Sequence, residues 1–218
     1  KGKWSHFIAK GVKEIRIVAS EVNDSKRIKR FLMSFFFYSA GVQTVLYMAS
    51  TLAEKELNFY QQELIILILI LQIVAIGGAY LFAWVSSKAS NKTSILIMLV
   101  IWSLVCVTAY FVESKVNFYI LAAAVGMVMG GIQSMSRSTY SKFVRTQKSE
   151  LTSYFSFYDI LEKSAIVAGT FSFGLIDQIS GNMKNSVVFL SAFFIVGLII
   201  LILTPFKMKD GHIPGTNS

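Results

Sequence analysis

Three ionisable residues lie inside a hydrophobic run that is long enough to cross a membrane. The run from Leu151 to Ile176 contains Asp159, Glu162 and Lys163. Asp159 and Lys163 are spaced by one helical turn, so they can pair on one face that Glu162 partly shares. If the helix begins near Ser153, Lys163 lies about 15 Å into an apolar core that is roughly 30 Å thick.

These charges have two interpretations. A charge at the bilayer centre costs roughly 2.5 to 3.5 kcal/mol on insertion scales, so it normally faces a bundle interior or a wet cavity. Asp159, Glu162 and Lys163 therefore either form a structural ion pair with a neighbouring helix, or they face a substrate or coupling ion. We favour the second interpretation, and Lys163 is the strongest candidate for meeting an anionic group.

Isolated polar residues in the other hydrophobic runs are weaker candidates for binding or coupling. Gln43 lies beside Gly41, and Gln133 follows a pair of glycines, so both are expected to border open space. Such groups also hydrogen-bond neighbouring helices, at about 0.6 kcal/mol each. Tyr38 can line a pocket or belong to an interfacial belt. Arg137, at the inner end of its run, is either a topology anchor or part of a gating salt bridge.

Six hydrophobic runs are expected to position these residues. Five contain no Asp, Glu, Lys or Arg, and each approaches the roughly 20 residues that a spanning helix needs. The hydrophobic fraction of 54% and the mean hydropathy of +0.59 agree. We predict an all-α integral membrane protein, with a six-transmembrane-helix bundle over residues 31–206 whose spans are 31–52, 64–85, 95–112, 116–136, 151–176 and 187–206.

The distribution of positive charge predicts the orientation of the bundle. If the N-terminus is cytoplasmic, the cytoplasmic segments hold seventeen Lys and Arg residues and the opposite loops hold three. This bias follows the positive-inside rule and places both termini in the cytoplasm, including the tail 207–218. The net charge of +9 therefore indicates anionic lipid, and not nucleic acid, as the partner.

Residues 1–30 are predicted to form a basic amphipathic linker on the cytoplasmic membrane surface. Apolar residues recur there at helical spacing while lysines and arginines fill the other faces. The linker is either a simple interfacial anchor or a lipid-responsive switch. Because the sequence has no initiator Met and no cleavable signal pattern before Phe31, the chain is expected to be a fragment of something longer.

The sequence offers no constellation for catalysis or metal chemistry. Cys106 is the only cysteine, and His6 and His212 lie in the tails, so neither a disulfide nor paired ligands are expected. No hydrolase, nucleotide-binding or metalloprotease motif is present. We predict no enzyme activity, no cofactor and no metal.

Several motifs carry a resemblance to a known family. Six helices after a basic linker resemble the C-terminal half of a twelve-helix major facilitator transporter. The stretches Tyr38–Thr44, Gly131–Ser138 and Phe155–Tyr158, the last followed by Lys163, are similar to the vacuole-effluxer-like permeases. This family includes the autophagy-related vacuolar amino-acid effluxer of fungi. The likeness covers about residues 13–205.

Two departures from the family pattern affect the expected mechanism. The family often has an acidic residue where Ala40 stands, so a proton-carrying carboxylate is missing there. The superfamily's acid-and-base gating loop is replaced by Ala83–Ser90, with Ser87 at the acidic position, although Lys88 remains a gating candidate. The resemblance therefore does not imply proton coupling.

The resulting hypothesis is a secondary active transporter, a permease or effluxer that moves small solutes by alternating access. The resemblance to the family implies amino acids as the substrate. Its partners would be the bilayer, the substrate, and a missing N-terminal six-helix half or a second copy; its expected location is the bacterial inner membrane. One alternative is a non-transporting membrane scaffold or sensor that has kept the transporter fold, which the substitutions at Ala40 and Ser87 favour. Another is a lipid-modifying enzyme with Asp159 and Glu162 as acid and base.

Overall fold

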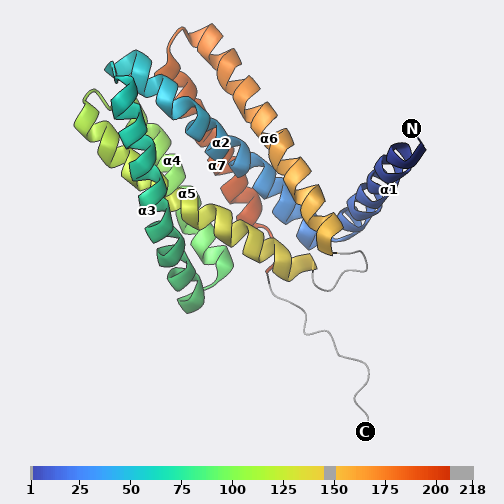
Figure 1. The fold of residues 1–218 in the computed structure, drawn as a ribbon. Helices are drawn as coiled ribbons and strands as arrows, with labels where there is room; N and C mark the ends of the chain where they lie inside the picture. The colour runs from blue at the N-terminus through green and yellow to red at the C-terminus, as the bar shows by residue number, and fades with distance from the viewer. Residues whose placement is uncertain (1, 145–150, 207–218) are drawn as a thin grey trace.

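The computed structural model describes residues 2–144 and 151–206, with side chains from residue 11 onward (Figure 1). The expected cytoplasmic tail 207–218 lies outside the described residues. Long helices joined by short turns make up the described part. Their bounds are α1 Gly2–Asp24, α2 Lys26–Leu57, α3 Gln61–Lys88, α4 Asn91–Tyr110, α5 Lys115–Val144, α6 Leu151–Ser180 and α7 Met183–Ile202.

The prediction of an all-α membrane bundle is confirmed. Within the described residues, α2, α3, α4, α5 and α7 are long and apolar enough to cross a membrane. The 30-residue α6 falls short of that composition, and it is the helix that carries Asp159, Glu162 and Lys163. It nevertheless packs against α2 and α7 over its length (Figure 1). A sixth span therefore stays a prediction.

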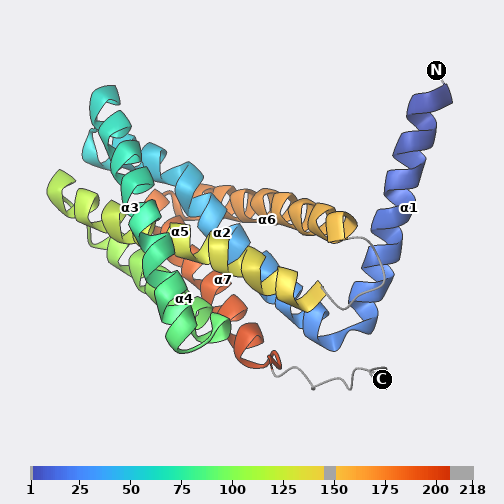
Figure 2. The same cartoon turned by 60° about the horizontal axis from the view of Figure 1, so that its bottom comes forward.

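The linker region is a helix that leaves the bundle at a steep angle (Figure 2). It ends at Asp24, because Ser25 adopts an extended backbone and its Oγ accepts a hydrogen bond from the Ile28 backbone amide, capping α2. The basic run 26–30, which was assigned to the linker from sequence, thus forms the first turns of α2. Val18 and Val22 of α1 are buried against the bundle.

Two carboxylates hold α1 to the inner end of α6. The Ser153 hydroxyl donates to Glu14 at 3.1 Å, and the Tyr154 hydroxyl donates to Glu21. The Tyr154 carbonyl in turn accepts a 3.1 Å bond from the Tyr140 hydroxyl of α5. The linker is therefore connected to both helices that carry the charged residues of the bundle.

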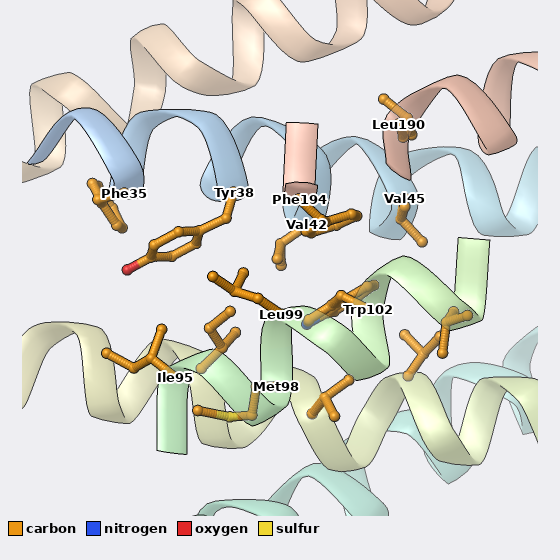
Figure 3. Close-up of a cluster of buried hydrophobic side chains, with 14 of the residues drawn as sticks. Phe35, Tyr38, Val42, Val45, Ile95, Met98, Leu99, Trp102, Leu190 and Phe194 are labelled. Carbon is orange, nitrogen blue, oxygen red and sulfur yellow. The ribbon is translucent and has the colours of Figure 1, made fainter. Parts of the chain in front are cut away.

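The apolar core lies between α2, α4 and α7 (Figure 3). The Trp102 indole of α4 stacks on the Phe194 ring of α7, with 5.3 Å between centroids, and both side chains are fully buried. Tyr38 of α2 lies at one edge of this cluster, with its hydroxyl pointing away from the aliphatic side chains (Figure 3).

Glycines bring α3 and α5 into backbone contact. A Cβ atom built on any of three glycines would overlap the backbone of the facing helix, because no side chain separates the two helices there. The facing pairs are Gly78 with Met127, Gly126 with Leu71, and Gly130 with Ala75. Gly126 and Gly130 of α5 are four residues apart, a spacing that lets two membrane helices approach closely.

Two cations hydrogen-bond to the carbonyl oxygens at the C-terminal end of α7. Lys92 Nζ of α4 donates to the carbonyl oxygens of Ile202 and Thr204, at 2.8 and 2.7 Å. The Arg30 guanidinium of α2 donates to the Leu203 carbonyl at 3.0 Å. The last carbonyls of a helix have no partner within it, so these bonds satisfy groups that the helix leaves open.

Candidate functional site

Polar side chains from α2, α5 and α6 converge on a pocket of about 130 Å³ in the half of the bundle where α2 and α6 begin. Each helix contributes residues one turn apart, which places them on a single face. The lining residues are Phe35, Tyr38, Ser39, Val42 and Gln43 of α2, Ile132, Gln133, Ser136 and Arg137 of α5, and Tyr158 and Glu162 of α6.

Glu162 lies at the centre of the polar contacts. Its carboxylate accepts a 3.0 Å hydrogen bond from the side-chain amide of Gln43, which joins α6 to α2. The other carboxylate oxygen lies 3.6 Å from the Arg137 guanidinium, which joins α6 to α5. The Glu162 side chain is only 15% exposed, whereas that of Asp159 is 50% exposed. One carboxylate thus connects all three helices that line the pocket.

Arg137 is shared between the two acidic residues of α6. Its guanidinium donates to Asp159 at 2.9 Å, lies 3.6 Å from Glu162, and stands 5.5 Å from the centre of the Tyr158 ring. The Arg137 and Asp159 side chains are 52% and 50% exposed. Among the inner-end residues named from sequence, Arg137 is the one that the structure brings into the charged cluster.

Asp159 and Lys163, which their spacing allows to pair, form no ion pair in the part of the chain that the structure describes. Asp159 turns toward Arg137, whose fork of donors can engage both carboxylates of α6. Lys163 is exposed beside Ile160 on the outer face of α6, over a shallow depression. Within residues 11–144 and 151–206, where side chains are described, none pairs with its ammonium group.

Tyr38 and Gln133 both line the pocket but differ in exposure. Tyr38 is 2% exposed and its hydroxyl lies 2.8 Å from Ser136 Oγ. Because the single Ser136 hydroxyl proton goes to the Ile132 carbonyl at 2.6 Å, Tyr38 donates and Ser136 accepts. Gln133 is exposed at the rim. Tyr38 is therefore fixed, whereas Gln133 is available to a ligand.

The expected role of Gly41 is corrected, and the gating candidate Lys88 lies apart from the pocket. Gly41 does not open room for Gln43, because it faces the Phe194 ring on the opposite side of α2, where a Cβ would lie 2.7 Å from a ring carbon. Lys88 is exposed at the end of α3. It forms no ion pair with any residue that the structure describes, so it is not brought together with Arg137.

The sequence reasoning overlooked Ser136 and Phe35 and left the role of Tyr158 open. Ser136 is buried, and the Phe35 and Tyr158 rings stack with 4.1 Å between centroids at the base of the pocket. The available signal was the one-turn spacing of Ser136 from Gln133, of Phe35 from Tyr38 and of Tyr158 from Glu162, which predicts a common face on each helix.

The arrangement presents both signs of charge in a small volume. A guanidinium, one carboxylate and two primary amides line one pocket, and the Asp159 carboxylate pairs with the same guanidinium beside it, so the pocket can meet an anionic, a cationic or a zwitterionic group. In the part of the chain that the structure describes, no three His, Cys, Asp or Glu side chains are grouped to hold a metal.

A bundle of apolar helices with a charged pocket on one face defines the chain as a polytopic integral membrane protein. A family model described as "Vacuole effluxer Atg22 like" matches residues 1–210. The chain belongs to this family, which confirms the resemblance carried by the motifs of α2, α5 and α6.

Curated relatives agree with this assignment. The chain is 30% identical over 203 residues to an uncharacterized MFS-type transporter, YxiO, of Bacillus subtilis, covering 93% of this chain and 47% of that protein. It is 26% identical to autophagy-related protein 22 of Yarrowia lipolytica over 94% of this chain and 34% of that protein. The Saccharomyces cerevisiae protein of the same name is 23% identical, over 96% and 41%. The chain spans less than half the length of these relatives.

Proposed function

We propose that this chain forms one half of a secondary transporter that moves small solutes by alternating access. The observation that carries the proposal is the half-exposed pair of Arg137 and Asp159 on a face that the bundle leaves open. Charges at that depth are costly against lipid, so this face is expected to border water or a second bundle. A substrate would bind between the two bundles and cross as they rock against each other.

The covering partner would be a second six-helix bundle. It would come either from the rest of a longer protein or from a second copy of this chain. The relatives named as transporter or autophagy-related protein are more than twice as long as the matched region, which supports the first source. Either source would complete the pocket with residues on the opposite wall.

Amino acids suit the charges of the pocket. An amino acid carries a carboxylate and an ammonium group, and the pocket offers Arg137 for the first and Glu162 for the second. Gln43 and Gln133 supply neutral donors and acceptors beside them. Binding would exchange the internal ion pair for two pairs with the ligand, which limits the cost of leaving either charge alone.

Lys163 would act on the uncovered face of α6. Its ammonium group has no partner in the described residues and lies at the depth where an unpaired cation is expensive. It would meet a substrate carboxylate, or an acidic residue of the opposing bundle that is released during the cycle. Asp159 also lines the shallow depression beside Lys163, so a substrate would reach both residues from the same side of α6.

We place both termini in the cytoplasm and the protein in a bacterial inner membrane. The excess of seventeen Lys and Arg residues over three supports the orientation. Relatives named for a vacuole effluxer come from fungi, while the Bacillus relative comes from a bacterium. Accessibility labelling of single cysteines introduced at Lys55 and at Lys88 would test the orientation.

Transport of labelled amino acids into vesicles that contain the native gene product tests the function. Lys163→Gln should abolish uptake while the amount of protein in the membrane stays the same. Lys55→Gln, an exposed change at the outer end of α2, is the matched control and should transport normally. Unchanged uptake by the Lys163 variant would remove the proposed role of this residue.

The same vesicles distinguish a transporter from a scaffold. If the native protein exchanges no solute from a broad set, the alternative of a sensor derived from a transporter fold gains support.

The size of the native product, probed with an antibody against residues 207–218, shows which partner to include. A band near twice the chain's 24.3 kDa would indicate a single twelve-helix product.

A further inference from the structure

A second pocket lies on the faces of α2 and α6 next to those that line the polar site. It has a volume of about 300 Å³, occupies the corner where α1 meets the bundle, and is apolar apart from one lysine. Phe157 and Leu161 of α6 line it, each one residue before a residue of the polar site, so it faces outward from the bundle. The remaining lining residues are Val22, Lys29, Leu32, Met33, Phe36 and Phe37.

The groove opens at the inner membrane surface, where α2 begins. Met33 is 47% exposed, so the groove is accessible from the bilayer. Val22 is 7% exposed and belongs to α1, the helix that leaves the bundle at a steep angle (Figure 2). An acyl chain lying in the groove would contact three helices at once.

Two lysines stand directly above the apolar groove. Lys26, Lys29 and Met33 recur at intervals of three and four residues, which puts them on one face of α2. Lys29 Nζ contacts a neutral partner, the Asn23 side-chain oxygen at 2.7 Å, and the ammonium group of Lys26 has no ion pair within the described residues. Neither positive charge is neutralised there.

The other cations of this helix turn have different roles. The Arg27 guanidinium stands 4.8 Å from the centre of the Phe143 ring, and Arg30 donates to the Leu203 carbonyl. On α1, the carboxylates of Glu14 and Glu21 accept hydrogen bonds from α6 hydroxyls. Lys26 and Lys29 are thus the cations of this turn that remain for an anionic group above the groove.

We propose that this corner is a binding site for one anionic phospholipid. The phosphate would contact Lys26 and Lys29, and an acyl chain would lie over Met33, Phe36 and Phe37. Basic pockets between helices on the cytoplasmic side suit anionic headgroups, and the apolar groove below matches the chain. The bound lipid would connect α1 to α2 and α6, and so would stabilise the linker against the helix that carries Glu162.

Native mass spectrometry of the purified gene product, titrated with phosphatidylglycerol and with phosphatidylcholine, tests the proposal. One phosphatidylglycerol should bind more tightly than phosphatidylcholine. The double variant Lys26→Gln, Lys29→Gln should weaken phosphatidylglycerol binding about 30-fold, because each lysine near an anionic group contributes about fivefold. The double variant Lys88→Gln, Lys142→Gln removes the same charge from the same membrane side and should bind normally.

Variants that fill the groove separate a defined site from a diffuse attraction of charge. Met33→Trp, and independently Leu161→Trp from the α6 wall, should displace both lipids while all cations remain; an unchanged elution volume in size-exclusion chromatography confirms that each variant is folded. Lipid binding that survives both groove variants would overturn the proposal. Equal affinity for the two lipids, or an equal loss in the control double variant, would overturn it as well.

Discussion

The contacts of α5 with α3 and with α6 differ in kind. Toward α3, glycines such as Gly130 bring the two backbones together with no side chain between them. Toward α6, the connection is made by long polar side chains, with Arg137 reaching both Asp159 and Glu162. One helix therefore carries a packed, apolar contact on one side and an exchangeable, charged contact on the other.

This difference indicates where the bundle can change. Backbone-to-backbone packing fixes the separation of α3 and α5, because interiors this close tolerate little displacement. Arg137 and Glu162 can instead exchange protein partners for ligand groups without moving a backbone. The α3–α5 pair would then serve as the rigid support, and α6 as the helix that responds to substrate.

The adjacent glycines of α3 give the largest expected effect. Gly78→Ala should destabilise the protein by about 3 kcal/mol, the upper end for overpacking, because the new Cβ overlaps the Met127 backbone. Gly77→Ala is the matched control, since nothing lies within 4 Å of its Cβ position. Thermal unfolding in detergent measures both. Equal melting temperatures would mean that the α3–α5 contact is not rigid.

Removing the shared cation tests the exchangeable side of α5. Arg137→Gln should lower transport about ten- to hundredfold, since hydrogen bonds to charged groups contribute roughly 1.5 to 3 kcal/mol. Stability should change by less than about 1 kcal/mol, because both the guanidinium and its Asp159 partner are half exposed. Uptake assays and thermal unfolding of the same preparation separate the two effects. A large loss of stability would make Arg137 a structural residue instead.

The contact of the linker with α6 gives a smaller effect. Tyr154→Phe removes the hydroxyl that donates to Glu21 and leaves the bond from Tyr140 to the Tyr154 carbonyl in place. We expect a loss of about 1 kcal/mol, confined to the docking of α1. Amide hydrogen exchange should become faster in α1 and stay unchanged in α3. Tyr47→Phe, at an exposed tyrosine of α2, is the control.

Most of the fold was predictable because the signal for each membrane helix lies within the sequence of that helix. The apolar runs and the absence of charge in five of them are properties of short segments. A membrane span over α6 was harder to predict from composition. The charged residues that make α6 a candidate for function also lower its hydropathy. The glycine contact of α5 was also predictable, because the spacing itself selects a face.

The partners within the site were not predictable in the same way. Asp159 and Lys163 share a helix face, so local spacing favoured their pairing. The actual partner, Arg137, lies on another helix, and its reach depends on how α5 and α6 pack together. Gln43 does border the pocket, but Gly41 does not open that space, because positions two apart on a helix point in nearly opposite directions and Gly41 is filled by Phe194 of α7.

The cations at the inner end of α7 have a consequence for experiments on orientation. Lys92 and Arg30 belong to the positive charges that would hold their ends of the protein in the cytoplasm, and they also satisfy the terminal carbonyls of α7. Neutralising them in order to invert the membrane orientation would also remove the hydrogen bonds that hold the C-terminal end of α7. Charge removal at Lys88 would report on orientation alone.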